Sequence, residues 1–241
     1  MAGMCGRYVL FSSTETLVSA LTTRLGEQVH PVASGGGSGG HIIGPSWNTA
    51  PTHRILVVRR FRGKLMLGPA VWGYRAPWSP GRVLFNARGE TAFDKASFRG
   101  SEPALVVMDG WYEWYVDGAG AKTPYLVVGD GVLTVAGLVR PDGEGNLRST
   151  VVTSRSVEPV AWLHDRMPRL LSGGQDGGEA LHWLDGDGPS LRALASSPPG
   201  GPDTAALQAR EVDRRVGDVS VNGPELLRDV AGGRPGDIMG E

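Results

Sequence analysis

The stretch ALVVMDGWYEWYV, residues 104–116, is rich in β-branched and aromatic side chains, and this composition predicts a β-strand. Its GWYEW part (110–114) carries one carboxylate, Glu113, between aromatic residues at the end of the apolar run. Two interpretations of Glu113 are open. It could be an exposed strand position flanked by core tryptophans, or a functional carboxylate held among apolar neighbours.

Segments on both sides of this stretch have the same character. The further predicted strands are GRYVLF (6–11), RILVVRRF (54–61), KLMLGPAVW (64–72), PYLVV (124–128), LTVAGLV (133–139) and STVVTS (149–154). The predicted helices are 13–25, 177–184 and 190–197. An S-x-x-E capping box beginning at Ser12 would start the first of them. Short, mainly antiparallel strands with a few helices predict a single mixed α+β domain.

The composition, with 40% hydrophobic and 20% charged residues in a chain of 241, is that of a globular protein. The only cysteine is Cys5, so no internal disulfide can form and we expect a cytoplasmic protein. No apolar run approaches the roughly 20 residues of a membrane span, and the N-terminus lacks the layout of a signal peptide. The formal net charge of −1 excludes a global basic field but not a local basic groove.

We place the predicted domain at residues 4–230. One low-complexity segment interrupts it and another follows it. The Gly/Ser stretch 33–40 is expected to be a flexible insertion, and residues 231–241 a disordered tail. The histidines are scattered and no phosphate-binding loop motif occurs, so we expect neither a metal site nor a cofactor.

Polar side chains gather in short motifs between the apolar segments. These motifs are NTAP (48–51), WGYRAPW (72–78), FNARGET (85–91), GWYEW (110–114), LHDRMP (163–168) and VGDVSVNGPEL (216–226). Each also has a purely structural interpretation: Asn48 and Asn86 could be turn residues, and the tryptophans could belong to the core. A cysteine nucleophile needs a base and an orienting group, which His164 and Glu113 would supply once the chain is folded.

With CGRY at the front, these motifs in this order resemble the SOS-response-associated peptidase family, the abasic-site-processing domain. The resemblance runs from about residue 4 to about residue 230, nearly the whole chain. It implies a barrel-like sheet of short strands with peripheral helices. It also implies a DNA-damage protein that binds single-stranded DNA at abasic sites and links itself covalently to the sugar aldehyde.

The implied chemistry depends on Cys5 being the first residue of the mature chain. An N-terminal α-amine has a pKa of about 7.7–8.0, so part of it is unprotonated and nucleophilic at neutral pH. The amine would attack the aldehyde and the thiol would close on the same carbon, giving a thiazolidine. An internal cysteine cannot do this, because its nitrogen is an amide. The chain has MAGM before Cys5, so we expect translation to start at Met4, or self-processing to remove residues 1–4.

The resemblance also assigns roles to single positions. Asn86 resembles the asparagine that hydrogen-bonds the linked sugar, and Glu113 resembles the glutamate that handles the proton of the α-amine. His164 resembles the histidine that shuttles protons during sugar-ring opening and crosslink reversal. The DNA-binding positions that it implies are Arg7, Arg88 and Arg166 for phosphates, Trp78 for base stacking, and Asn48 and Pro51 for the pocket wall. Relatives can have two adjacent tryptophans where this chain has one, which weakens the expected stacking.

Two other hypotheses stay open. The first is a peptidase with an N-terminal cysteine nucleophile that acts on proteins or on its own N-terminus. The second is a non-covalent module for binding single-stranded DNA. In the leading hypothesis the partner is abasic single-stranded DNA, including junctions with duplex DNA, and no membrane is involved. We expect a cytoplasmic monomer that associates with the nucleoid when it is bound to DNA.

Overall fold

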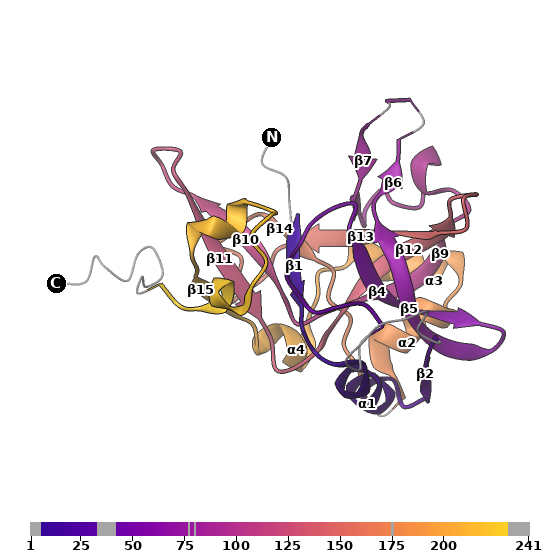
Figure 1. The fold of residues 1–241 in the computed structure, drawn as a ribbon. Helices are drawn as coiled ribbons and strands as arrows, with labels where there is room; N and C mark the ends of the chain where they lie inside the picture. Colours follow the sequence, from indigo (N-terminus) through magenta and orange to yellow (C-terminus); the bar gives the residue numbers. More distant parts are fainter. Residues whose placement is uncertain (1–5, 33–41, 77, 80, 175, 231–241) are drawn as a thin grey trace.

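The computed structural model describes residues 6–32, 42–76, 78–79, 81–174 and 176–230. Cys5, the insertion expected at 33–40 and the tail expected at 231–241 lie outside the described residues. The described chain folds into two main sheets with peripheral helices (Figure 1). Most strand pairs are antiparallel, which confirms the predicted mixed α+β domain.

Five strands form a closed barrel. They are β4 (Arg54–Phe61), β5 (Lys64–Trp72), β9 (Glu102–Met108), β12 (Leu133–Pro141) and β13 (Leu147–Arg155). Antiparallel pairing runs in the order β13-β12-β9-β4-β5, and β5 then pairs with β13 in parallel. This last pairing closes the ring and confirms the expected barrel-like sheet. The barrel sheet is extended by β2 (Val29–Pro31), β8 (Asn86–Arg88) and β14 (Arg166–Pro168).

A second, five-stranded sheet lies beside the barrel (Figure 1). Its strands, in spatial order, are β15 (Gln208–Glu211), β11 (Lys122–Val128), β10 (Gly110–Val116), β1 (Arg7–Leu10) and β3 (Ser46–Thr49). All four strand pairs are antiparallel. β1 is therefore hydrogen-bonded on both edges, with β10 on one side and β3 on the other.

The stretch 104–116, predicted as one strand, is divided between the two sheets. The chain leaves β9 of the barrel at Met108 and enters β10 of the second sheet at Gly110. At the break, the Asp109 carboxylate accepts hydrogen bonds from the amides of Phe11 (2.7 Å) and Ser12 (2.9 Å). Asp109 thus links the point where the sheets meet to the residues that follow β1.

The helix predicted at 13–25 is α1 (Thr14–Leu25), and its cap is Ser13 rather than Ser12. The Ser13 hydroxyl accepts a hydrogen bond from the amide of Thr16 (3.1 Å). The Ser12 hydroxyl is used elsewhere, because it donates to Asp109 (2.6 Å). The expected capping box is therefore wrong: the cap lies one residue later, and the residue three positions after it is Thr16 rather than a glutamate. α1 buries a leucine stripe against the main core, made up of Leu17, Leu21 and Leu25.

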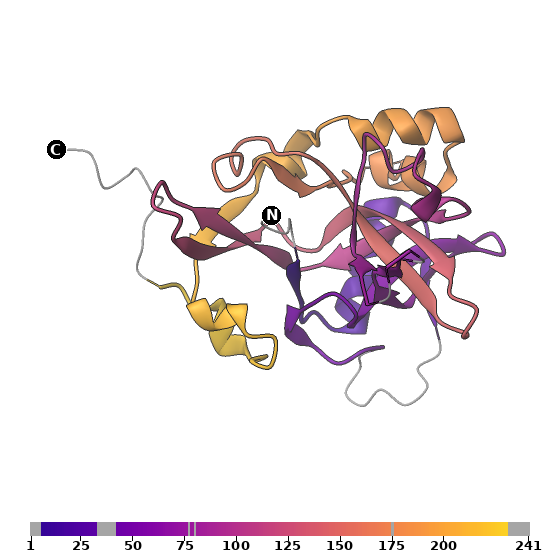
Figure 2. The ribbon, with the colours of Figure 1, turned by 90° about the horizontal axis from the view of Figure 1, so that it is seen from above.

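The later helices cover the barrel from outside (Figure 2). They are α2 (Gly178–Asp185), α3 (Gly188–Ser196) and the short α4 (Gly201–Ala205). The indole N–H of Trp183 on α2 donates to the carbonyls of Ala104 on β9 (3.0 Å) and Gly137 on β12 (3.1 Å). A small hairpin of β6 (Tyr74–Arg75) and β7 (Val83–Leu84) projects from the barrel.

Short 3-10 turns complete the fold, at Ala96–Phe98, Arg214–Gly217 and Pro224–Leu227. The main apolar core fills the barrel and includes the fully buried Trp72 and Trp111. A smaller cluster covers the opposite face of the second sheet; its members are Val9, Tyr112, Leu126, Val212, Val216 and Leu226. None of the helices in the described part of the chain is both long and apolar enough to cross a membrane.

Candidate functional site

Glu113 is a buried carboxylate on the face of β10 that points toward the main core. Side chains of a strand alternate between the two faces of a sheet. Tyr112 and Trp114 pack in the smaller cluster, whereas Trp111 and Tyr115 pack against the main core on the other face. Glu113 shares the second face, and only 4% of its surface is exposed. This burial excludes the interpretation of Glu113 as an exposed strand position.

Trp162 connects this face to the segment that carries His164. Its ring centroid lies 5.8 Å from that of Tyr115 and 5.0 Å from that of Tyr125. Tyr125 on β11 is directly opposite Glu113 on β10, so these two side chains share a face. The loop with Trp162 and His164 therefore packs over the side of the sheet on which Glu113 lies.

His164 stands directly before β14, and its Nδ1 atom has two mutually exclusive hydrogen-bond partners. The amide of Arg166 donates to Nδ1 over 3.0 Å, which requires this nitrogen to be unprotonated. The Oδ1 atom of Asp165 lies 2.9 Å from the same Nδ1 and forms an ion pair with a protonated imidazole. Nδ1 thus has a partner whether or not it carries a proton, and these contacts fix the orientation of the ring.

β8 places Asn86 and Arg88 on one face, because they are two residues apart. The strand pairs in parallel with β13, with Asn86 opposite Val151 and Arg88 opposite Thr153. Ala87 between them is buried in the main core. Asn86 and Arg88 therefore face away from the barrel interior.

The turn after β8 is held against α3 through Gly89. A Cβ at this position would lie 1.9 Å from the carbonyl oxygen of Ala195 on α3, so only glycine fits without moving the backbone. The Gly89 amide also donates to the carbonyl of Thr153 on β13 (2.8 Å). This close approach fixes the backbone on either side, which carries Arg88 and Glu90.

The start of the described chain reaches the same region. The antiparallel register of β1 against β10 brings Gly6 next to the position of Glu113. A Cβ on Gly6 would lie 3.8 Å from the ring of Phe85, which directly precedes Asn86. Gly6 thus lies directly before β1, one residue before the first pair of β1 with β10, and beside the ring of the residue that precedes β8. Cys5 itself lies outside the described residues.

Three adjacent strands each contribute an arginine to one face. Arg88 on β8 is opposite Thr153 on β13, and Arg166 on β14 is opposite Arg155 on β13. Thr153 and Arg155 are two residues apart, so all of these side chains share a face. A pocket of about 310 Å³ opens there, and it is lined by Arg88, Arg155, Ser156, Ala161, Asp165 and Arg166.

Arg166 is held on the pocket wall by a two-point ion pair with Glu90. Each of its terminal nitrogens contacts one Glu90 oxygen, with an Nη2–Oε2 distance of 2.8 Å. Nη2 also donates to the carbonyl of Thr153 (2.6 Å). The hydrogen bonds from Arg166 hold the pKa of Glu90 below its ordinary value, against the opposing effect of burial. Glu90 is therefore ionised at neutral pH and offsets the charge of Arg166.

Asn48 joins β3 to the VGDVSVNGPEL motif. It is buried, and its side-chain amide donates to three carbonyl oxygens of that motif: Val216 (3.2 Å), Asp218 (2.9 Å) and Val221 (2.9 Å). The half-buried Arg7 reaches the same motif, because its Nη2 donates to the carbonyl of Gly217 (3.2 Å). Burial lowers the pKa of Arg7, and the nearby Asp218 partly opposes this shift.

Pro51 and Trp78 lie apart from this pocket. Pro51 is half-buried in the turn between β3 and β4. Trp78 lies between β6 and β7 and is 59% exposed, the highest exposure among the large hydrophobic residues described. Neither residue lines the arginine pocket. The structure therefore groups Arg88 with Arg166, places Asn86 and His164 beside them, and leaves Arg7 and Asn48 at the C-terminal motif.

Sequence reasoning missed three charged residues of this site. Glu90 lies inside the FNARGET motif and Asp165 inside LHDRMP, so the motifs already marked their neighbourhoods. Arg155 lies in no motif, and only the pairing of β13 with β14 brings it to the pocket. Among the described residues, no group of three or more potential metal ligands comes together.

The structure is thus an α+β protein with a closed barrel, an arginine-lined pocket and a buried carboxylate on the neighbouring sheet. The profile of the family described as SOS response associated peptidase (SRAP) matches residues 4–219, and the chain belongs to this family.

The relatives carry consistent names. The chain is 28% identical over 237 residues to abasic site processing protein YoqW of Bacillus subtilis (strain 168), covering 93% of this chain and 99% of YoqW. It is 25% identical over 238 residues to abasic site processing protein YedK of Escherichia coli (strain K12), covering 94% and 100%. The crystal structure of a phage-related protein from Bordetella bronchiseptica superposes with a TM-score of 0.63 at 27% identity, covering 87% of this chain and 95% of that one.

Proposed function

We propose that this protein processes abasic sites in DNA. It binds the single strand at the damaged site and forms a covalent thiazolidine with the sugar through Cys5 as the first residue. The crosslink shields the site from strand cleavage. The family membership supports the DNA-damage role, and the relatives are named for abasic site processing.

The observation that carries this proposal is the convergence at Gly6. A reactive first residue needs its amine close to acid–base groups; the β1–β10 register continued one residue back from Arg7 puts Gly6 beside Glu113, and Gly6 also lies next to the ring of Phe85, the residue before Asn86. Neighbouring Cα atoms are about 3.8 Å apart, so an amine at position 5 is one residue from this point. Cys5 needs to lead the mature chain for this chemistry, which removes residues 1–4.

The covalent step balances without a cofactor. The Cys5 α-amine adds to the aldehyde carbon of the ring-opened sugar, and the carbonyl oxygen leaves as water once it has accepted protons. The product is a Schiff base. The thiol sulfur then bonds to the same carbon, and the thiol proton ends on the nitrogen. Aldehyde and aminothiol thus give a five-membered thiazolidine and one water molecule, and hydrolysis reverses the reaction.

The side chains at the site suit these proton transfers. Glu113 is buried on the side of β10 over which the His164 loop packs, so its carboxylate can take the proton that the amine loses. Nδ1 of His164 has a partner within the protein whether or not it carries a proton, so the proton exchanged with the sugar would move at Nε2, the other ring nitrogen. The amide of Asn86 offers both a donor and an acceptor to the linked sugar.

The DNA strand would be held through its backbone. Arg88 and Arg166 face the pocket from the two short strands that pair with β13. Arg88 can bind phosphate oxygens at two points, and Arg166, whose terminal nitrogens hold Glu90, adds its charge to the pocket wall. Trp78 is exposed at the β6–β7 hairpin and can stack on a base beside the gap. Such contacts read charge and an absent base rather than sequence.

The test is crosslinking to an oligonucleotide with one abasic site. Protein that begins at Cys5 should give a product that survives denaturing electrophoresis, and the undamaged oligonucleotide should give none. Cys5→Ala should abolish the product. The matched control keeps Met-Ala-Gly-Met in front of Cys5, because this chain has the same thiol but only an amide nitrogen at that residue.

Three outcomes contradict the proposal. One is the absence of any product with the Cys5-first chain. Another is equal crosslinking by the chain that retains Met-Ala-Gly-Met. The third is equal affinity for abasic and intact strands without a covalent product, which supports a non-covalent binding module instead. Mass spectrometry of the native N-terminus shows which residue leads the mature chain and whether the protein trims itself.

A further inference from the structure

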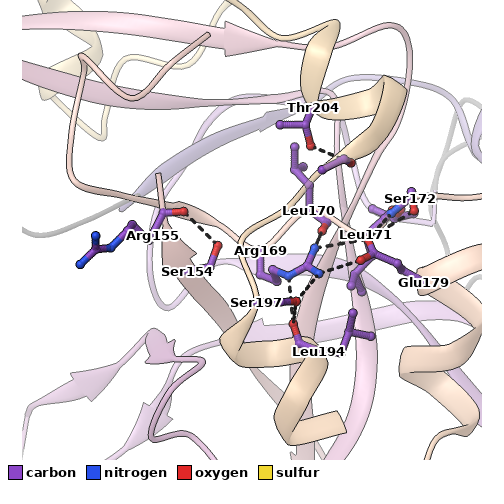
Figure 3. A network of polar contacts seen from close by, with 12 residues as sticks. Ser154, Arg155, Arg169, Leu170, Leu171, Ser172, Glu179, Leu194, Ser197 and Thr204 are labelled. Atoms are coloured by element: carbon purple, nitrogen blue, oxygen red, sulfur yellow. Dashed lines mark hydrogen bonds and ion pairs between the residues drawn. The ribbon is translucent and has the colours of Figure 1, made fainter. Parts of the chain in front are cut away.

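Arg155 is a pocket residue without a structural task of its own. It is the last residue of β13, its side chain is exposed, and no ion pair or side-chain hydrogen bond of its guanidinium is found among the described residues. Figure 3 shows its guanidinium extending away from the polar network around Arg169. An exposed, unengaged cation at the edge of a pocket is available for a ligand.

The position of Arg155 is fixed by its neighbours. It stands opposite Arg166 on β14 and two residues beyond Thr153, which is opposite Arg88 on β8. Adjacent strands lie about 4.8 Å apart, so Arg155 and Arg166 are direct neighbours, and Arg88 lies diagonally on the other side of β13, two residues back from Arg155. Like charges directly opposite each other are destabilising in a sheet unless something offsets them. Glu90 offsets Arg166, whereas Arg155 keeps its full charge.

The charges of the pocket show what Arg155 contributes. The pocket is lined by three arginines and one carboxylate, Asp165, and a second carboxylate, Glu90, is paired with Arg166. The net charge of these five side chains is +1. Glu90 remains ionised because Arg166 holds its pKa below the ordinary value. Without Arg155 the same set of side chains would be neutral. The attraction of this pocket for an anion therefore depends on Arg155.

We propose that Arg155 is an additional phosphate-binding residue for the DNA strand, next to the phosphate held from Arg88 and Arg166. This inference rests on the proposed function, since it takes the pocket to be part of the path of single-stranded DNA. A guanidinium on an exposed strand end can swing to a phosphate oxygen without first breaking a contact within the protein. Ser156 follows it and also lines the pocket, with its amide donating to the carbonyl of Asp165 (2.9 Å).

The test measures binding of a single strand that carries a non-reactive tetrahydrofuran abasic analogue, so that no crosslink interferes. Affinity is determined at several salt concentrations for the wild type and Arg155→Ala. Loss of one phosphate contact should make the slope of log affinity against log salt shallower by about 0.7. Affinity at low salt should fall about tenfold, as expected for one charge-assisted hydrogen bond. Arg155→Lys should restore the slope and recover part of the affinity.

Arg62→Ala is the matched control, because it removes an exposed arginine at the β4–β5 turn that does not line the pocket. It should leave the slope unchanged. If the wild type binds the strand and Arg155→Ala has the same slope and affinity, the role of Arg155 is refuted while the proposed function stands. If the wild type shows no salt-dependent binding, both fail. A decrease of equal size in Arg62→Ala also overturns the inference, because it indicates a general charge effect.

Discussion

Arg166 and Arg169 are three residues apart, and each forms an ion pair with a glutamate, yet they occupy opposite environments. Arg166 lies on the wall of the pocket, paired with Glu90. Arg169 lies behind it, paired with Glu179 on α2, and none of its side-chain surface is exposed. The same side chain thus serves two regions of the molecule, one open to ligand and one closed.

Arg169 is satisfied at every nitrogen (Figure 3). Nε donates to the carbonyl of Leu194 on α3 (3.0 Å), and Nη2 donates to Glu179 (2.8 Å) and Ser197 (3.0 Å). Nη1 donates to the carbonyl of Leu170. A buried charge is tolerated when it is paired and hydrogen-bonded in this way, and here it ties α2 and α3 to the chain after β14.

Arg166 is satisfied less completely. Its terminal nitrogens contact Glu90 and Thr153, but its Nε is buried without a hydrogen-bond partner among the described residues. Glu90 is also more exposed than Glu179 (41% against 32% of the side chain). The contrast shows that a paired arginine is evidence of a binding site only when its charge faces a space that a ligand can enter.

The largest expected effect is on stability, from Arg169→Met. This change leaves Glu179 without its partner and unties α3, so the free energy of unfolding should fall by about 3 kcal/mol in urea titrations. The value is at the low end for a broken buried pair, because Glu179 keeps part of its surface in water. The matched variant Arg166→Met should lose about 1 kcal/mol. The distinction between the two regions breaks down if both lose equally.

A double change sharpens the same comparison. Replacing both partners by apolar residues, Arg169→Met with Glu179→Leu, should recover a large part of the stability that Arg169→Met loses. The reason is that no unpaired charge then remains. If the double variant is less stable than Arg169→Met, the carboxylate is held by something other than Arg169.

A smaller effect is expected from acid. Burial would raise the pKa of Glu179, but the hydrogen bond and charge of Arg169 outweigh it and hold this pKa below the ordinary value. A carboxyl with a lowered folded-state pKa contributes stability above its unfolded pKa of about 4.3, and loses it as the pH falls through the folded value. The stability gap between wild type and Glu179→Gln should therefore be largest near neutral pH and shrink below pH ~4.

The pH dependence expected for Glu179 can be compared with that of Glu90, the carboxylate paired with Arg166. Its pKa is lowered as well, mainly by the hydrogen bonds of Arg166. Because the Glu90 side chain is more exposed, Glu90→Gln should show a gap with the same sign but a smaller size. Urea unfolding between about pH 3 and 7 measures both gaps. A larger gap for Glu90 would place the stronger ion pair at the pocket instead.

The smallest expected effect is on DNA affinity. Glu90→Gln removes a negative charge from the pocket wall, so it should raise affinity for single-stranded DNA a few-fold at low salt. Glu179→Gln removes the same charge from the closed region and should leave affinity unchanged. Fluorescence anisotropy with the tetrahydrofuran strand measures both. A rise in both variants would mean that total charge, rather than the pocket, decides binding.

The sequence predicted the elements whose signals are local. The strands at 54–61 and 64–72 are confirmed to the residue, because apolar runs flank the Arg62-Gly63 turn. The prediction of one strand at 104–116 is wrong, because the segment is divided between two sheets at Asp109. The hydrogen bonds of Asp109 at this break go to residues far away in the sequence. Local composition cannot reveal such a partner.

The same limit applies to the site. β8 and β14 have three residues each and exist through pairing with β13, so no periodic pattern marks them. Arg155 reaches the pocket only through that pairing. The alternation of strand side chains predicts that residues 111, 113 and 115 share one face. It does not predict which residues pack against that face. The catalytic roles of Glu113, His164 and Asn86 stay predictions.

The position of β1 between β3 and β10 has a consequence for the order of events during synthesis. β3 follows β1 within about 40 residues, but Tyr112, the β10 partner of Arg7, is made about 100 residues later. At roughly 5–20 residues per second, this edge of β1 stays unpaired for about 5–20 s. An N-terminal processing enzyme acting on this chain would therefore meet β1 before the second sheet is complete. The fold itself thus provides an interval in which a new first residue can be exposed.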